Sequence, residues 1–137
     1  MIRYFKPVLW CLFVVLVACG GSGGDGDSPE SEPEFGSLTV TWDEPNTNAD
    51  GTCPNDVAGY DIYIGTAMRS YSRVETVLSD AISCDGPVPA CDAEDETREC
   101  TYTVNDVTVG TKYVALRVYN TSGYRSRYSA EVVKLVD

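Results

Sequence analysis

The chain contains no histidine. Histidine is the side chain used most often in general acid–base catalysis, and it is the commonest metal ligand. Neither a Ser-His-Asp nor a Cys-His catalytic site can therefore be built from this chain. We expect no enzymatic activity and no cofactor.

Basic residues are scarce as well. Ten lysines and arginines face twenty-one acidic residues, which gives a formal net charge of −11. Two of the ten, Arg3 and Lys6, lie in the first eighteen residues, and without these residues the net charge is −13. So acidic a chain repels nucleic acid and the anionic faces of membranes. Nucleic-acid binding is excluded as a leading hypothesis.

The chain has no apolar run long enough to span a bilayer, which needs about 20 residues. The apolar run from Val8 to Cys19 follows Arg3 and Lys6 and has the length of a signal-peptide core. Its end, Leu16-Val17-Ala18-Cys19, resembles the bacterial lipobox. The resemblance implies that residues 1–18 are a lipoprotein signal peptide, removed before Cys19, and that Cys19 carries the lipid.

The residue after Cys19 is Gly20 rather than the aspartate that favours retention in the inner membrane. For a Gram-negative host, the lipoprotein resemblance therefore implies an exported protein held in the outer membrane. Whether it faces the periplasm or the cell surface stays open.

Residues 19–35 are expected to form a tether. Fifteen of the sixteen residues from Gly20 to Phe35 are Gly, Ser, Asp, Glu or Pro. Such a segment has almost no apolar surface to bury, so it cannot offset the entropy lost on ordering. We expect a lipidated cysteine followed by a flexible acidic spacer.

From residue 36 onward the pattern is all-β. Leu38, Val40 and Trp42 alternate with polar residues, and Tyr60, Ile62 and Ile64 do the same, which is the signature of half-buried strands. The expected strands cover residues 37–42, 60–64, 71–78, 101–104, 112–119 and 129–135. Short strands without a helical segment indicate a two-sheet antiparallel sandwich.

The strings SLTVTW, DVAGYDIYIGT and GTKYVALRVYNTSGYRSRYSAEV resemble strands B, C and F–G of a fibronectin type III domain. This immunoglobulin-like resemblance covers about residues 36–135, and we assign residues 36–137 to the domain. It makes Trp42 the core tryptophan of strand B. Strand A has no clear candidate. Tyr113 is out of phase with Val114, so either a bulge follows Tyr113 or Lys112 takes the inward position.

The chain has six cysteines. Cys11 would leave with the leader and Cys19 would carry the lipid, which leaves Cys53, Cys84, Cys91 and Cys100. An even number in an exported domain predicts two disulfides, with three connectivities open. The fibronectin-like arrangement of loops favours Cys53–Cys100 and Cys84–Cys91. Zinc is disfavoured because no C-x₂-C pair occurs, and we expect no bound metal.

Two groups of residues are candidate binding sites. The acidic loop contains Asp92, Glu94, Asp95 and Glu96, whose carboxylates suit calcium or a basic protein patch, although a charge run is usually only a solvated face. Tyr63 and Tyr119 are expected to face outward near Arg117, where tyrosines bind proteins or sugars or simply shield the sheet.

These features predict a lipid-anchored envelope protein, expected to be monomeric, that displays a non-catalytic module. It would bind an envelope protein or a polysaccharide, or act as a spacer. The alternative is a calcium-dependent module, or a hydrolase accessory domain, that uses the acidic loop 85–99. Membrane contact is expected through the lipid anchor alone.

Overall fold

The computed structural model describes residues 31–48, 50–91 and 97–137. The strands of these residues lie in one compact unit, Glu32–Asp137. The expected signal peptide, Cys19 and most of the tether lie outside the described residues. In the part of the chain that is described, no helix has the length and apolar character needed to cross a membrane.

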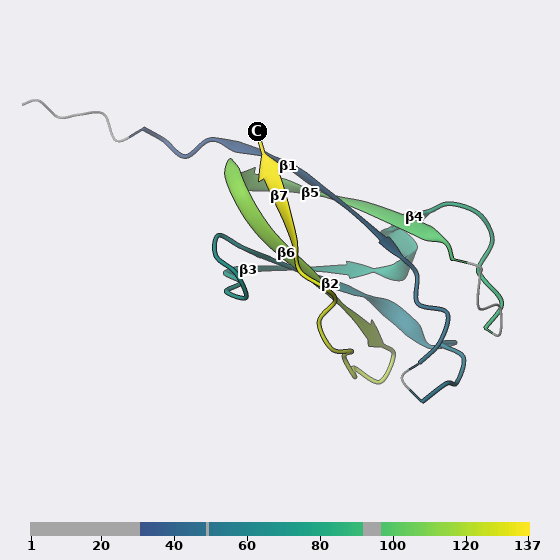
Figure 1. Ribbon diagram of the computed structural model, residues 1–137. Helices are drawn as coiled ribbons and strands as arrows, with labels where there is room; N and C mark the ends of the chain where they lie inside the picture. The colour runs from purple at the N-terminus through teal and green to yellow at the C-terminus, as the bar shows by residue number, and fades with distance from the viewer. Residues whose placement is uncertain (1–30, 49, 92–96) are drawn as a thin grey trace, which may run out of the picture. The chain divides into compact units, whose positions relative to one another are not determined.

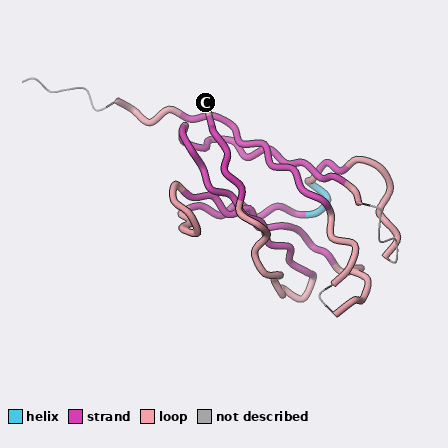
Figure 2. Tube along the Cα trace, in the orientation of Figure 1, coloured by secondary structure: helices cyan, strands magenta, loops and turns pink. Residues whose placement is uncertain are grey.

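The described residues form two antiparallel sheets (Figures 1 and 2). The strands are β1 (Phe35–Asp43), β2 (Val57–Gly65), β3 (Arg73–Leu78), β4 (Ser83–Cys84), β5 (Glu99–Thr108), β6 (Gly110–Asn120) and β7 (Val132–Val136), with a 3₁₀ turn at Ser79–Ala81. One sheet has the order β1-β5-β4 and the other β3-β2-β6-β7. The predicted all-β fold is confirmed as an immunoglobulin-like sandwich.

The core lies between the sheets. Alternation along β1 buries Leu38 and Val40 and exposes Ser37, Thr39 and Thr41. The core consists of Leu38, Val40, Ile62, Ile64, Val77, Val104, Val107, Val114 and Val136. Trp42 is only half-buried at its margin, 4.9 Å from Tyr60 between ring centroids.

β1 is one of the two edge strands of the smaller sheet, and its only strand partner among the described residues is β5. The position next to β1, where strand A would lie, is filled by no described strand. The described residues therefore contain no strand A, and the edge of β1 is open in this part of the chain.

Lys112, rather than Tyr113, takes the inward position on β6. Its side chain is buried, and its Nζ donates a hydrogen bond of 2.9 Å to the Thr108 hydroxyl. The pairing of β6 with β2 and β7 is regular through residues 113 and 114, so no bulge follows Tyr113. The lysine ties β6 back to the end of β5, across the turn at Gly110, whose φ is +106°.

The segment before β7 pairs with β6 through serine hydroxyls. The amides of Ser126 and Ser129 donate to the carbonyls of Val118 and Leu116, both at 2.9 Å. In return, the hydroxyls of the same serines accept from the amides of Val118 (3.0 Å) and Leu116 (2.9 Å). These bonds hold residues 125–129 against the edge of β6.

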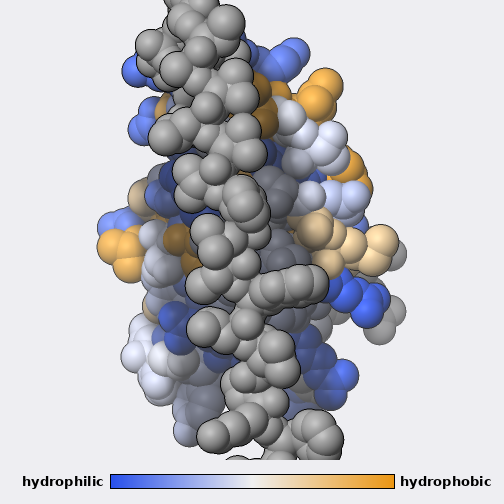
Figure 3. Space-filling model, turned by 90° about the vertical axis from the view of Figure 1, so that its left-hand side faces the viewer, coloured by the Kyte–Doolittle hydropathy of each residue, from blue (hydrophilic) through white to orange (hydrophobic). Residues whose placement is uncertain are grey.

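Several large hydrophobic residues of the described domain are exposed to solvent. Phe35, Met68, Val133 and Leu135 are among them. Figure 3 shows hydrophobic residues in small separate groups among hydrophilic ones. Single exposed apolar residues are normal on a soluble domain and do not by themselves mark a binding site.

Candidate functional site

The disulfides join Cys53 to Cys91 and Cys84 to Cys100, so the favoured pairing was wrong. The reason is β4, which the sequence did not predict. This two-residue strand pairs with the start of β5 and sets Cys84 directly opposite Cys100, with Cα atoms 4.0 Å apart. Cys53 in the β1–β2 loop then bonds to Cys91, with a Cα–Cα distance of 5.2 Å.

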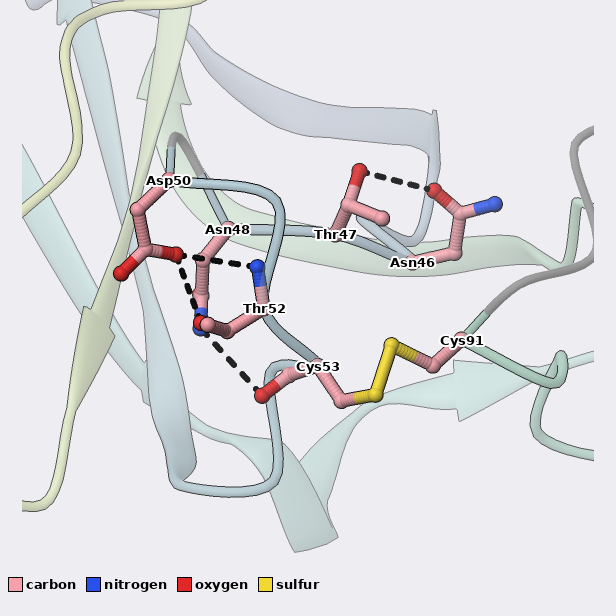
Figure 4. Close-up of a disulfide and its surroundings, with 7 residues drawn as sticks. All are labelled: Asn46, Thr47, Asn48, Asp50, Thr52, Cys53 and Cys91. Atoms are coloured by element: carbon pink, nitrogen blue, oxygen red, sulfur yellow. Dashed lines mark hydrogen bonds between the residues drawn. A yellow bond between two sulfur atoms is a disulfide. The ribbon is translucent and has the colours of Figure 1, made fainter.

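The β1–β2 loop at the first disulfide is held by its own polar groups (Figure 4). The Asp50 carboxylate accepts hydrogen bonds from the Thr52 hydroxyl (2.6 Å) and amide (3.0 Å), and these bonds lower the pKa of Asp50. The Asn48 side-chain amide donates to the Cys53 carbonyl at 3.2 Å. These groups therefore shape the loop.

The acidic residues Asp92, Glu94, Asp95 and Glu96 lie outside the described residues. The two residues that bound the 85–99 loop, Asp85 and Glu99, are linked through the backbone: the Asp85 amide donates to the Glu99 carbonyl at 2.9 Å. Within residues 31–48, 50–91 and 97–137, no group of three acidic or cysteine side chains is arranged to hold a metal ion.

Three tyrosines meet on the outer face of the larger sheet. The ring of Tyr63 on β2 lies 5.7 Å from that of Tyr71 and 4.9 Å from that of Tyr128, and the last two are 5.6 Å apart. The guanidinium of Arg117 on β6 lies 5.0 Å from the centre of the Tyr128 ring. We call Tyr63, Tyr71, Arg117 and Tyr128 the tyrosine patch.

The tyrosine patch is anchored at its rim. The Tyr71 hydroxyl donates to Glu131 at 2.7 Å, and the same carboxylate oxygen accepts from the Arg69 amide at 2.8 Å. Desolvation, followed by the hydrogen bond to Glu131, raises the pKa of Tyr71 to about 12. Arg117 donates to the Ser126 carbonyl at 2.7 Å. The patch is therefore pre-organised, which lowers the ordering cost of binding.

The strand register places Tyr63 and Tyr119 on the outer face of the larger sheet, as the sequence predicts, but only Tyr63 makes the ring contacts of the tyrosine patch. Tyr119 pairs across from Gly59, where an added Cβ would lie 2.6 Å from the Tyr119 hydroxyl. The guanidinium of Arg125 lies over the Tyr119 ring, 5.6 Å from its centre. Tyr119 therefore covers the backbone of β2 at a position where only glycine leaves room.

Sequence reasoning missed Tyr71 and Tyr128 as members of the patch. Tyr128 lies in the connection between β6 and β7, in which residues 121–130 are all exposed. Its serines bring Tyr128 next to β2, and no hydrophobic periodicity marks that pairing. The Ser-x-x-Ser spacing of Ser126 and Ser129 is the one signal that could have indicated it.

A surface depression of about 570 Å³ lies between the β1–β2 loop and the β6–β7 connection. Its polar side chains hold these loops together: the side-chain amide of Asn120 donates to Asp56 at 2.9 Å, and the side-chain carbonyl of Asn120 accepts from the Tyr124 backbone amide at 2.9 Å. The polar groups in the depression are therefore used to hold the loops together, and this depression is not our candidate binding site.

No family model matches the chain, and neither a curated protein nor a solved structure is significantly similar to it. The function is therefore inferred from the fold and from the geometry of its surfaces.

Proposed function

We propose that this chain is a lipid-anchored envelope protein whose fibronectin type III-like domain binds another protein, without catalysis, through the tyrosine patch. The observation that carries the proposal is the gathering of three tyrosines and one arginine on a single sheet face. Tyrosine and arginine are the residues most enriched among the dominant contacts of protein interfaces. Tyr128 is half exposed, at 50% of its surface, and so is available for contact.

A protein is favoured over a polysaccharide because the tyrosine rings pack against one another. Interplanar angles of 59° and 79° around Tyr63 turn its neighbours edge-on rather than into one flat platform. A sugar ring stacks best on an open aromatic face, whereas an irregular cluster suits a side chain that inserts among the rings.

The lipid anchor at Cys19 belongs to the proposal. Two disulfides support an exported compartment, because such bonds persist in oxidising surroundings. The Leu16–Cys19 lipobox resemblance supplies the attachment point, and Gly20 favours the outer membrane. An acidic tether of residues 19–35 would hold the domain clear of the membrane surface.

The binding surface is tested by affinity capture from the organism's own envelope extract. The full-length chain is compared with Tyr128→Ala and with Tyr124→Ala, a matched control because Tyr124 is an exposed tyrosine in the same connection. Loss of capture with Tyr128→Ala alone supports the tyrosine patch. Equal capture by both variants contradicts it, and a glycan-array signal lost in Tyr128→Ala assigns the patch to a polysaccharide.

The anchor is tested separately with Cys19→Ala. The variant should lose its acyl groups by mass spectrometry and leave the membrane fraction, whereas Cys11→Ala, in the expected leader, should remain lipidated. An unlipidated mature chain in the wild type would contradict the anchor but leave the binding surface untouched.

A further inference from the structure

Among residues 31–48, 50–91 and 97–137, no strand pairs with the free edge of β1 between Thr39 and Asp43. Its pairing with β5 is regular from Leu38 to Asp43. The Glu44 amide donates to Arg98 on the β5 side at 2.8 Å. Because backbone groups alternate along an antiparallel ladder, those of Thr39, Thr41 and Asp43 then point away from β5.

Proteins usually block such edges with charges, proline, bulges or short strands. The other described edge strands are blocked in this way: β4 has only two residues, β3 contains Arg73 and Glu75, and β7 contains Lys134. In β1, the outward-facing residues of the open stretch before Asp43 are the threonines 39 and 41. A strand could therefore add to this edge.

A groove of about 530 Å³ runs beside the same stretch of β1. Val40 and Trp42 on β1 line one wall, and Leu116, Ala130 and Val132 line the other, so much of the lining is apolar. A strand added to β1 would direct alternate side chains toward this groove.

The wall of the groove contains two unsatisfied polar atoms. The indole Nε1 of Trp42 and the hydroxyl of Tyr60 are buried and form no well-aligned hydrogen bond among the described residues. The two groups are near each other: burial raises the pKa of Tyr60, and the Trp42 N–H opposes that rise. Buried polar groups are almost always paired in native proteins, so each exception needs an explanation. Both atoms have almost no accessible surface, so a segment bound in the groove could pair with them only after a shift of the Trp42 ring.

We infer that the open edge of β1 and its groove bind an extended segment of a basic partner protein, which adds to the sheet as a further strand. Apolar side chains on one face of that segment fill the groove. A basic residue at its end meets Asp43, which lies across from Glu99 in the ladder. Among the described residues, neither carboxylate takes part in a salt bridge.

Charge and composition disfavour the two other occupants. The unit from Glu32 to Asp137 has eight basic and eighteen acidic residues, a net charge of −10, so a second copy is repelled. In a second copy, moreover, Leu38 and Val40 already fill that copy's own core. The chain's own segment from Gly20 to Ser31 contains no aliphatic or aromatic residue to fill the groove.

The test uses the full-length chain with Trp10→Phe, which leaves Trp42 as its only tryptophan. The probe is a peptide of alternating valine and threonine with lysine at both ends, and the control peptide has glutamate at both ends. We expect the lysine peptide to change the Trp42 fluorescence with saturation, and the glutamate peptide to bind about tenfold or more weakly. Equal binding of the two peptides would overturn the inference.

Edge pairing is tested with Thr41→Pro, which removes an outward N–H that β5 does not use. Thr41→Val is the matched control because it keeps the amide. We expect Thr41→Pro to weaken binding of the lysine peptide about tenfold or more, and Thr41→Val to bind this peptide as the parent does. Unchanged binding by Thr41→Pro refutes strand addition.

Asp43→Lys provides a test that does not depend on how well the proline variant folds. Asp43→Lys should weaken binding of the lysine peptide and strengthen binding of the glutamate peptide. If the preference for the lysine peptide is unchanged, the charge argument is contradicted. A dimer in sedimentation that Thr41→Pro dissociates would assign the edge to a second copy and overturn the inferred partner. Tyr128 borders both surfaces. None of these variants changes a residue of the tyrosine patch, however, so loss of peptide binding in Thr41→Pro or Asp43→Lys reports on the β1 edge and not on the patch.

Discussion

Asp61 on β2 and Arg125 in the β6–β7 connection form a hydrogen-bonded ion pair, with Nε and Oδ2 2.6 Å apart. The carboxylate is almost fully buried, and its other oxygen accepts from the Thr76 hydroxyl at 2.7 Å. The hydrogen bond and charge of Asp61 raise the pKa of Arg125. The pair fastens the β6–β7 connection over the outer face of β2, and this connection also carries Tyr128.

We expect Asp61→Asn to lower the free energy of unfolding by about 1–3 kcal/mol, because hydrogen bonds to charged groups are worth about that much. Arg125→Gln should destabilise more than Asp61→Asn, since it leaves a buried carboxylate without its cation. Urea unfolding of both variants and of the double variant measures the coupling. Additive effects would show that the pair does not act as a unit.

The disulfides differ in exposure. Cys53 is exposed, whereas Cys100 is fully buried. A mild reductant should therefore open Cys53–Cys91 first. The disulfides close loops with sequence separations of 38 and 16 residues. Replacing both Cys53 and Cys91 by serine should therefore lower the free energy of unfolding by about 4 kcal/mol, and replacing both Cys84 and Cys100 by about 3 kcal/mol. Peptide mapping without reduction checks the connectivity; a peptide joining Cys53 to Cys100 would contradict it.

Ile62 lies at the centre of the core with no exposed surface. Ile62→Ala should lower the free energy of unfolding by about 2–5 kcal/mol through lost contacts and the cavity left behind. Val74 on the neighbouring β3 is 49% exposed, so Val74→Ala should change stability by about 0.5 kcal/mol or less. Equal losses in the two variants would contradict the assigned faces of the sheet.

Tyr71 should make the domain sensitive to alkali. Its folded-state pKa of about 12 exceeds the ordinary tyrosine pKa of 10.0, so the folded domain holds the phenolic proton more tightly. The resulting stabilisation is complete below pH 10 and is lost as the pH rises from 10 to 12. Tyr71→Phe should remove this part of the pH dependence.

Tyrosinate absorbance during rapid pH jumps, with the Tyr71→Phe trace subtracted, isolates this group. Glu131→Gln should shift the subtracted midpoint toward that of an ordinary tyrosine. A wild-type midpoint near pH 10 would show that Tyr71 is free of Glu131 in solution.

The strands with clean alternation were predictable. The pattern around Leu38 and Val40 on β1, and that of Ile62 and Ile64 on β2, places the same residues in the core that the structure does. On β5 the alternation fails, because Val104 and Val107 are both buried although three positions apart. A bulge at Asp106, with a φ of +54°, absorbs the extra residue. The predicted strand of residues 101–104 was therefore too short.

Contacts between distant segments were not predictable in the same way. The four cysteines of the domain leave three pairings open, and a two-residue strand such as β4 has no sequence signature. The tyrosine patch depends on Ser126 and Ser129 replacing backbone groups in a ladder. Tyr63 could be placed from its own strand, but Tyr128 could not.

The two ends of the folded unit adjoin each other. A Cβ atom added at Gly36 would lie 2.8 Å from the carbonyl oxygen of Asp137, so β1 begins where β7 ends (Figure 1). A short linker can therefore join these ends, and new ends can open at the exposed turn near Met68, giving a circular permutant with unchanged sheets. For the same reason the unit can be inserted as a cassette into a surface loop of a host protein.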